Sequence, residues 1–284
     1  MKHRLVGWVA GVAMFAASVA QAEPLKLWQV RHAGSGNIYY GGAVKDHQFY
    51  TGQITTGPQV WDRAGNLVGS YATNTASKSS VPLGPYVFFS NCEGGVYRIN
   101  SDWQTDLVGP IDPGPGPETL ATDGEHLYTN DDNIRGLIHK YKVSNEEGNF
   151  TLAEIWAATT GVARVRGLSY HNGKLYAADY GGTSLIEVDA ETGVSTTIIT
   201  LPANGSYQAV RSGNRIYVVG TDDHLRVYET DGNSWKDAGS HNLGLGDLYG
   251  ISDVDNDCVW ITSYDRNISF WRLEPKRGTI VVEF

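Results

Sequence analysis

The sequence predicts an all-β fold, namely a single β-propeller of about six four-stranded blades with very little helix. Three observations lead to this prediction: a recurring unit of about 40 residues, a composition rich in glycine and aromatic residues, and no sustained 3.6-residue apolar period. The 284-residue chain contains 34 Gly, 16 Tyr and 8 Trp but only 2 Met. Glycine suits turns and aromatic side chains suit half-buried pleated sheets, so the composition agrees with short strands joined by tight turns.

Six copies of the unit are visible along the chain. In each copy an apolar residue is followed by an aromatic one, and a polar turn precedes most of these pairs. The pairs are Phe49-Tyr50, Val87-Phe88, Leu127-Tyr128, Leu175-Tyr176, Ile216-Tyr217 and Val259-Trp260. Their aromatic members are 38, 40, 48, 41 and 43 residues apart, which is typical of propeller blades with four short strands. In the fourth unit we expect strands over 167–171, 174–178, 184–189 and 194–201.

Two terminal segments have to close the ring. Residues 25–31 and 279–284 both have the pattern of a strand, and either one suits the outer edge of the last blade. A closed ring leaves no exposed sheet edge, which is why the terminal strands of a propeller meet. Residues 25–40 are alternatively half of a seventh blade, but six blades are favoured because only six complete units are present.

The N-terminus has the order of a secretory signal peptide over residues 1–22. A positive head, Lys2-His3-Arg4, precedes an apolar run that ends near Ala17, and Ala20-Gln21-Ala22 forms a small-x-small cleavage site. We therefore expect an exported protein, periplasmic or secreted, whose propeller domain spans residues 23–284. No later stretch approaches 18 apolar residues, so we expect no membrane insertion.

The unit resembles those of β-propellers in the broad YVTN, NHL and WD40-like group. The resemblance covers nearly all of residues 23–284 and lies in the period and the placement of aromatic residues. The Gly-His…Trp-Asp signature, the kelch diglycine pattern and the sialidase Asp-box are all missing from the sequence. The resemblance therefore implies a fold and no particular activity.

The net charge narrows the classes of ligand that the protein can bind. Without Lys2 and Arg4 the 22 basic residues become 20, against 31 acidic ones, so the net charge is near −11. This charge repels nucleic acid and permits neutral or cationic ligands, including calcium.

The strand pattern places Cys92 and Cys258 at opposite ends of a strand, about 15 Å apart, whereas a disulfide needs Cα atoms within about 7 Å. We expect both thiols to be free.

Strand polarity predicts where function lies. If the four strands of a blade are a, b, c and d from the axis outward, the d–a connections and the b–c loops share one face, which we call the channel-mouth face. Carboxylates, tyrosines and an arginine are concentrated in these segments. The acidic run over 253–257 falls on the opposite face and is interpreted as a turn, because it lacks the glycine and the bidentate glutamate of a calcium loop.

The candidate residues on the channel-mouth face fall into three groups. The predicted ligand-binding residues are Glu93, Glu118, Asp132, Tyr180, Tyr207, Asp223 and Asp265. The predicted oxygen ligands for Ca²⁺ or another divalent ion are Glu118, Asp131, Asp179 and Asp222. The candidates for catalysis or proton transfer are His224, Tyr249 and Arg166. For each single aspartate or asparagine the plain alternative is a side chain that caps a turn.

Three functions are compatible with this pattern. The first is an exported binding or scaffold protein that holds a protein, a glycan or a small molecule on the channel-mouth face. The second is a metal-assisted hydrolase or lyase, which resembles lactonase-type propellers in having acidic side chains around the axis, although the motifs of that family are missing. The third is an accessory or immunity protein that blocks an exported partner.

Overall fold

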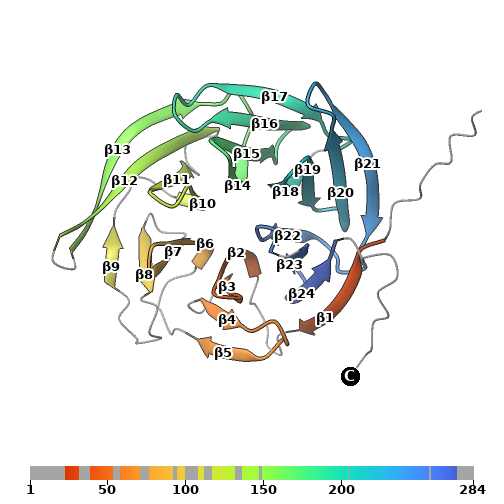
Figure 1. Cartoon of the computed structure of the whole chain (residues 1–284), viewed down its shortest axis with the longest axis horizontal. Coiled ribbons are helices and arrows are strands. Elements are labelled where there is room, and N and C mark those ends of the chain that lie inside the picture. The colour runs from red at the N-terminus through yellow and green to blue at the C-terminus, as the bar shows by residue number, and fades with distance from the viewer. Residues whose placement is uncertain are drawn as a thin grey trace, which may run out of the picture.

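Twenty-four strands form in the described part of the chain, and they pair into six four-stranded antiparallel sheets around a central axis (Figure 1). The computed structural model describes residues 23–31, 39–53, 58–70, 77–91, 95–99, 108–111, 117–131, 136–146, 149–203, 205–255 and 257–273. The predicted six-bladed propeller is therefore confirmed. The expected signal peptide, the strand over 279–284 and Cys92 lie outside the described residues.

The blades are numbered in chain order. Blade 1 contains β2 (Tyr39–Lys45), β3 (Gln48–Gln53), β4 (Gln59–Trp61) and β5 (Leu67–Ser70). Blade 2 contains β6 (Ser77–Leu83), β7 (Tyr86–Asn91), β8 (Val96–Ile99) and β9 (Val108–Ile111). Blade 3 contains β10 (Pro117–Thr122), β11 (His126–Asp131), β12 (Leu137–Glu146) and β13 (Asn149–Thr159). Blade 4 contains β14 (Val165–His171), β15 (Lys174–Asp179), β16 (Ser184–Asp189) and β17 (Ser195–Thr200). Blade 5 contains β18 (Ser206–Ser212), β19 (Arg215–Gly220), β20 (His224–Thr230) and β21 (Trp235–Asn242). Blade 6 contains β22 (Leu248–Ile251), β23 (Cys258–Ser263), β24 (Asn267–Arg272) and β1 (Leu25–Arg31).

Blade 4 shows how local sequence sets the strands. Its four strands agree with the predicted ranges to within two residues. The turn between β14 and β15 contains Asn172 and Gly173, both at positive φ (48° and 79°). An Asn-Gly pair with this backbone matches the right-handed twist of the two flanking strands, and so produces a tight hairpin. The second strand, β15, is buried at five of its six residues because blades 3 and 5 cover its two faces.

The N-terminal strand closes the ring. β1 pairs with β24 as the outer strand of blade 6, with Leu25 opposite Arg272. Trp28 of β1 packs its ring against Trp260 and Phe270, at centroid distances of 5.0 and 6.0 Å, and its Nε1 donates a hydrogen bond to the carbonyl of Arg63. β1 therefore completes the last blade, and it does not form part of a seventh.

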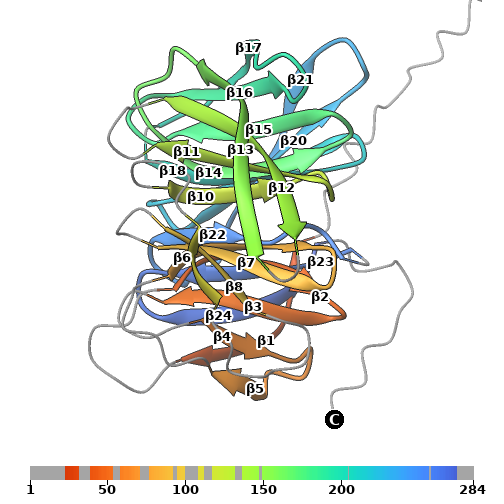
Figure 2. The same cartoon turned by 90° about the vertical axis from the view of Figure 1, so that its left-hand side faces the viewer.

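A long hairpin of blade 3 packs against blade 2. The strands β12 and β13 have 10 and 11 residues, and their hairpin crosses the side of blade 2 (Figure 2). Phe150 of this hairpin lies 5.1 Å from the ring of Tyr86 and 5.8 Å from that of Phe88. The guanidinium of Arg98 lies 4.0 Å from the Phe150 centroid, so apolar and cation–π contacts join the two blades.

Cys258 is buried and its thiol is free, and burial raises its pKa. No helix in the described ranges is long and apolar enough to cross a membrane.

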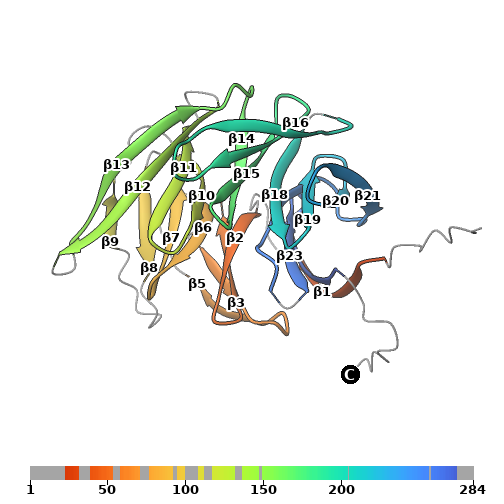
Figure 3. The ribbon, with the colours of Figure 1, turned by 45° about the horizontal axis from the view of Figure 1, so that its top comes forward.

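A β-bulge occurs at the same height in the innermost strand of every blade. In each case the innermost strand has one residue more than its partner strand, for example Tyr207 between the pairs Ser206–Gly220 and Gln208–Val219. The other five bulges lie in β2, β6, β10, β14 and β22. A bulge redirects a side chain and removes a backbone N–H from the ladder. Figure 1 labels all of these strands around the axis, and Figure 3 shows β2, β6, β10, β14 and β18 in a tilted view.

In blades 3, 4 and 6 the N–H group next to the bulge donates a hydrogen bond to a side chain of the preceding blade. The N–H of Leu120 donates to Ser79 Oγ at 3.2 Å, and the N–H of Leu168 donates to Thr119 Oγ1 at 3.2 Å. The N–H of Ile251 donates to Gln208 Oε1 at 3.1 Å. Since a buried N–H without a partner costs about 1–3 kcal/mol, these bonds hold neighbouring blades in register.

Replacing Thr119 by valine tests this connection. Thr119→Val keeps the shape but removes the acceptor for the Leu168 N–H, and we expect it to lower the free energy of unfolding by about 1–3 kcal/mol. Urea denaturation followed by tryptophan fluorescence measures the loss. The matched variant Thr119→Ser keeps the hydroxyl and should lose less than half as much. Equal losses in the two variants would show that the bond contributes nothing.

Candidate functional site

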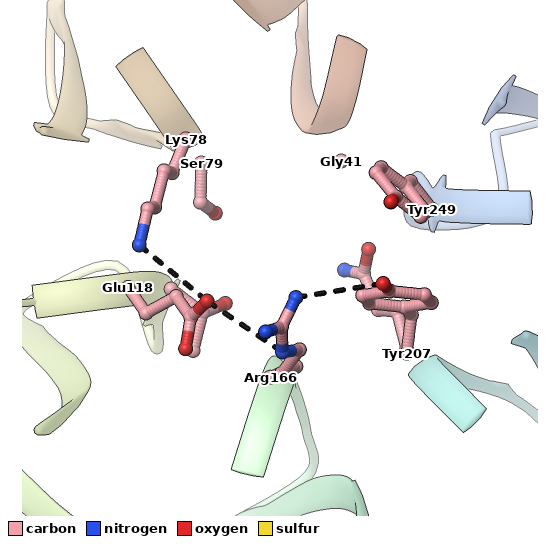
Figure 4. A pocket seen from close by; sticks show the side chains of 9 residues that line it. Gly41, Lys78, Ser79, Glu118, Arg166, Tyr207 and Tyr249 are labelled. Carbon is pink, nitrogen blue, oxygen red and sulfur yellow. Dashed lines mark hydrogen bonds and ion pairs between the residues drawn. The ribbon is translucent and has the colours of Figure 1, made fainter. Parts of the chain in front are cut away.

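The bulges place one residue of each blade around the channel mouth. These residues are Gly41, Lys78, Glu118, Arg166, Tyr207 and Tyr249, which line a pocket together with Ser79, Thr119 and Gln208 (Figure 4). The pocket has a volume of about 20 Å³, which is enough for one water-sized group. The pocket therefore has room for a single small group only.

Glycine at position 250 is required by the close approach of blades 1 and 6. A Cβ built on Gly41 would lie 2.3 Å from Gln208 Oε1, and one built on Gly250 would lie 2.2 Å from the Cα of Gly41. The strands β2 and β22 thus nearly touch at this height. Gly41 adds no side chain to the mouth at blade 1, whereas blades 2, 3 and 4 add the charged groups of Lys78, Glu118 and Arg166.

Three cations surround the carboxylate of Glu118. Oε1 of Glu118 lies 3.4 Å from Lys78 Nζ and 3.7 Å from Arg166 Nε, and its Oε2 lies 3.4 Å from an Nη of Arg164. The glutamate side chain is only 6% exposed, whereas its partners are 12–26% exposed. These four side chains carry one negative and three positive charges in a partly desolvated space.

Asn130 holds the backbone that carries Glu118. Its Oδ1 accepts hydrogen bonds from the N–H groups of Glu118 and Thr119, at 3.1 and 2.9 Å, and its Nδ2 donates to the Val165 carbonyl at 2.7 Å. Asn130 is buried in β11, so it is a structural bridge between blades 3 and 4. Asn130 therefore fixes the backbone from which the Glu118 side chain extends.

Arg166 joins the charged half of the mouth to a chain of tyrosines. Its guanidinium carbon lies 4.3 Å from the ring centroid of Tyr180 and 5.3 Å from that of Tyr207, and its Nη1 donates to the Tyr207 hydroxyl at 3.4 Å. The rings continue outward: Tyr207 and Tyr249 are 4.3 Å apart, and Tyr249 and Tyr264 are 5.3 Å apart. Tyr264 is 49% exposed, so the chain reaches the surface.

Burial raises the pKa of Tyr207 and that of Tyr249 above the ordinary value of tyrosine. Both side chains are therefore neutral phenols at neutral pH. The ring of Tyr207 is buried between its neighbours, whereas that of Tyr249 is partly exposed. A phenol with a raised pKa is a weak acid, which does not favour proton transfer by Tyr249.

The four predicted metal ligands do not converge. Asp179 is buried, and its Oδ1 accepts hydrogen bonds from the N–H groups of Arg164 and Gly181 at 3.0 and 3.2 Å. Asp131 is buried at the end of β11. Asp222 forms an ion pair with Arg226 and is 40% exposed. Partial burial acts to raise the pKa of Asp222. The hydrogen bond from Arg226 and the positive charge of that side chain nevertheless hold the pKa below its ordinary value.

Among the residues that the structure describes, no group of three or more His, Cys, Asp or Glu side chains is arranged to hold a metal ion. Glu118 alone of the predicted set faces the axis, and three cations surround it. The residues at the mouth therefore do not fit a divalent cation.

The other predicted residues are distributed over the same face. Asp223 accepts a hydrogen bond from the N–H of Leu245 at 2.8 Å, and His224 lies 3.9 Å from the carboxylate of Asp222. Asp265 is exposed. Glu93 and Asp132 lie outside the described residues. The structure thus brings together Glu118, Arg166, Tyr180, Tyr207 and Tyr249.

Two residues of the mouth were missed from sequence. Lys78 occupies the bulge position of blade 2, 40 residues before Glu118, so extending the repeat to the start of each innermost strand finds it. Arg164 precedes the strand β14 and has no equivalent in the repeat. Its proximity to Glu118 depends on the direction of two side chains from different blades.

Comparison with known proteins supports the fold alone. No family model matches the chain, and no curated protein matches it. A chain in the crystal structure of a mitotic checkpoint complex is similar over 97% of this chain and 100% of its own length, with a TM-score of 0.66 and 12% identity. The computationally designed protein Ika8 is similar over 82% of this chain and 70% of its own, with a TM-score of 0.54 and 12% identity. At this identity both similarities bear on the propeller fold alone.

Removal of the central negative charge should destabilise the protein. Glu118→Gln keeps the shape but leaves Lys78, Arg164 and Arg166 without their shared counter-ion. We expect the free energy of unfolding to fall by about 2–3 kcal/mol, since partial exposure of the cations reduces the larger penalty of a fully buried broken pair. Guanidinium denaturation measures it, and sodium chloride should reduce the difference. A variant as stable as the wild type would contradict the role of Glu118 as counter-ion.

Proposed function

We propose that this chain is an exported binding protein that holds an anionic ligand at the mouth of its central channel. The ring of strand-borne side chains around Arg166 is the observation that carries this proposal. A propeller provides a rigid ring for binding, and ligand sites usually combine ring faces with a few polar groups. Here the polar groups include three cations around one carboxylate, and the ring faces belong to tyrosines.

The chemical class of the ligand follows from this combination. Arginine recognises carboxylates and similar anions through its fixed set of N–H groups. Arg166 directs Nη1 to Tyr207 and Nε to Glu118, and we propose that Nη2 contacts the ligand. The small pocket suits one carboxylate oxygen or a group of similar size. The outer tyrosine rings, Tyr249 and Tyr264, suit a flat ring or a sugar face. We therefore propose an acidic sugar or a small aromatic acid in preference to a protein surface.

Binding is favoured over the metal-assisted hydrolase or lyase. That alternative needs oxygen ligands that converge on the axis, whereas Asp179 caps backbone N–H groups and Asp222 is paired with Arg226. Glu118 is held by cations, and the two mouth tyrosines remain protonated. None of these groups is placed as a free base or as a metal ligand.

Binding of glucuronate and glucose tests the proposed ligand class. The two sugars differ mainly in a carboxylate, so we expect glucuronate to bind at least tenfold more tightly in isothermal titration calorimetry, about 1.4 kcal/mol. Arg166→Met should remove this preference, and Glu118→Gln should increase the affinity while it lowers the stability. The matched control is Arg211→Met, because Arg211 also lies against two rings, Tyr176 and Trp235, but outside the mouth. Equal binding of both sugars would exclude the anionic class.

Processing of the leader tests export. Expression of the full chain in a bacterium should yield a periplasmic or secreted protein whose mass and N-terminal sequence begin at Glu23. Ala22→Leu replaces the small residue at the cleavage site and should leave a longer, unprocessed chain. Recovery of the intact chain, with residues 1–22 present, from the cytoplasm of cells expressing the wild type would contradict export.

A further inference from the structure

One side chain of the channel mouth has a chemistry that the binding of an anion does not use. Of the described lysines, Lys78 alone lines the mouth pocket. Its Nζ lies 3.4 Å from Glu118 Oε1, and its side chain is only 12% exposed. Because the bulge of β6 directs this side chain to the axis, a primary amine is held beside a space for one small group.

Lys78 is the strongest nucleophile that the described residues offer to this pocket. The hydroxyls of Ser79 and Thr119 accept hydrogen bonds from backbone N–H groups of the next blade. A hydroxyl also needs an adjacent base before it attacks a carbonyl group, whereas the amine of a lysine adds to a carbonyl group and forms a Schiff base. The guanidinium of Arg166 stays protonated and is not a nucleophile.

The positions of Lys78 and Arg166 define the spacing of the groups that a ligand can present. The two side chains reach Glu118 from different sides (Figure 4). Lys78 Nζ and Arg166 Nε contact the same oxygen, at 3.4 and 3.7 Å, and are therefore no more than about 7 Å apart. A ligand joined to Nζ by its carbonyl carbon, with a carboxylate on the next carbon, reaches a guanidinium about 6 Å away at standard bond lengths. The spacing therefore matches a carbonyl group directly beside a carboxylate.

We propose that Lys78 forms a Schiff base with a 2-oxo acid whose carboxylate contacts Arg166. This inference rests on the anion site proposed above, and it narrows the ligand to acids with a carbonyl group beside the carboxylate. That class includes acidic sugars with a 2-oxo group and aromatic 2-oxo acids. The pocket has room for the carbonyl group, and the rings of Tyr249 and Tyr264 contact the rest of the ligand outside it.

The covalent step needs no reactant besides the ligand. The nitrogen of Lys78 forms a bond to the carbonyl carbon, and the bond between that carbon and its oxygen breaks. The oxygen leaves as water and takes both of its protons from the ammonium group. The product is a protonated imine, so the positive charge stays on the same nitrogen and Glu118 keeps its ion pair. A carboxylate held by Arg166 places the carbonyl carbon beside the amine, and such placement accelerates bond formation.

Reductive trapping with pyruvate tests the proposal. Sodium cyanoborohydride reduces an imine to a stable amine, so the adduct adds about 72 Da to the modified lysine and is located by peptide mass spectrometry. We expect Lys78 to be modified at least tenfold faster than Lys140 and Lys174. These two lysines are matched controls in the same sample, because both form ion pairs with carboxylates outside the mouth. Lys78→Arg keeps the positive charge opposite Glu118 and should lose the fast adduct.

Three further measurements connect the adduct to the anion site. Pyruvamide replaces the carboxylate of pyruvate by a neutral amide of nearly the same shape, and it should modify Lys78 at least tenfold more slowly. Glucuronate in excess should slow the modification of Lys78 by pyruvate at least tenfold and leave that of Lys140 unchanged. Both comparisons use the wild type, so they do not depend on the folding of a variant. Arg166→Met should reduce the rate with pyruvate to that with pyruvamide.

Three results would overturn the proposal. They are modification of Lys78 no faster than that of Lys140 and Lys174, equal rates with pyruvate and pyruvamide, and a rate at Lys78 that excess glucuronate does not slow. If glucuronate still binds more tightly than glucose in calorimetry, the first result removes the Schiff base and leaves the anion site in place. If neither glucuronate nor pyruvate binds, the anion site itself is wrong.

Discussion

The structure depends on one extra residue in the innermost strand of each blade. This residue displaces the backbone at the same height six times. It turns Lys78, Glu118, Arg166 and their equivalents into the channel, and it leaves nearby N–H groups without a ladder partner. Side chains of the preceding blade accept the hydrogen bonds of three of them, and Ser79 and Thr119 directly follow Lys78 and Glu118 in sequence. The same local irregularity therefore builds the mouth and joins the blades, so neither property can change without the other.

A second consequence is that the two ends of the channel carry different charged groups. Three cations surround one carboxylate at the mouth, while Asp253 and Asp123 line a second cavity at the other end. Ser79 and Gln208, both neutral, line both spaces and separate the two charged regions. The net charge of the whole chain, which is negative, does not reveal this arrangement, because it sums all charged residues and not only those at the axis. Charges near a partly desolvated axis act more strongly than those on the outside of the ring.

The fold was largely predictable because its signal is repeated. Six apolar–aromatic pairs give the number of blades, and the strands of blade 4 follow from its turns. Part of the site was predictable for the same reason, since Glu118, Arg166, Tyr207 and Tyr249 begin equivalent strands. The roles of Asp179 and Asn130 were not predictable: an acid or amide that caps backbone N–H groups has the same sequence appearance as one that binds a ligand. The cations around Glu118 come from three different segments, and no local pattern records which way long side chains point.

Closure by the N-terminal strand affects the order in which the protein can fold. The residues of β1 are synthesised first, yet their partners in β24 follow some 240 residues later, as the pair Leu25–Arg272 shows. Until β24 exists, Trp28 lacks the rings of Trp260 and Phe270, and β1 remains an unpaired edge. The final step therefore joins the most distant parts of the chain, and topologies of this kind fold slowly. A chain that stops before β24 keeps five potential blades with no means to complete the ring, and its open edges favour aggregation.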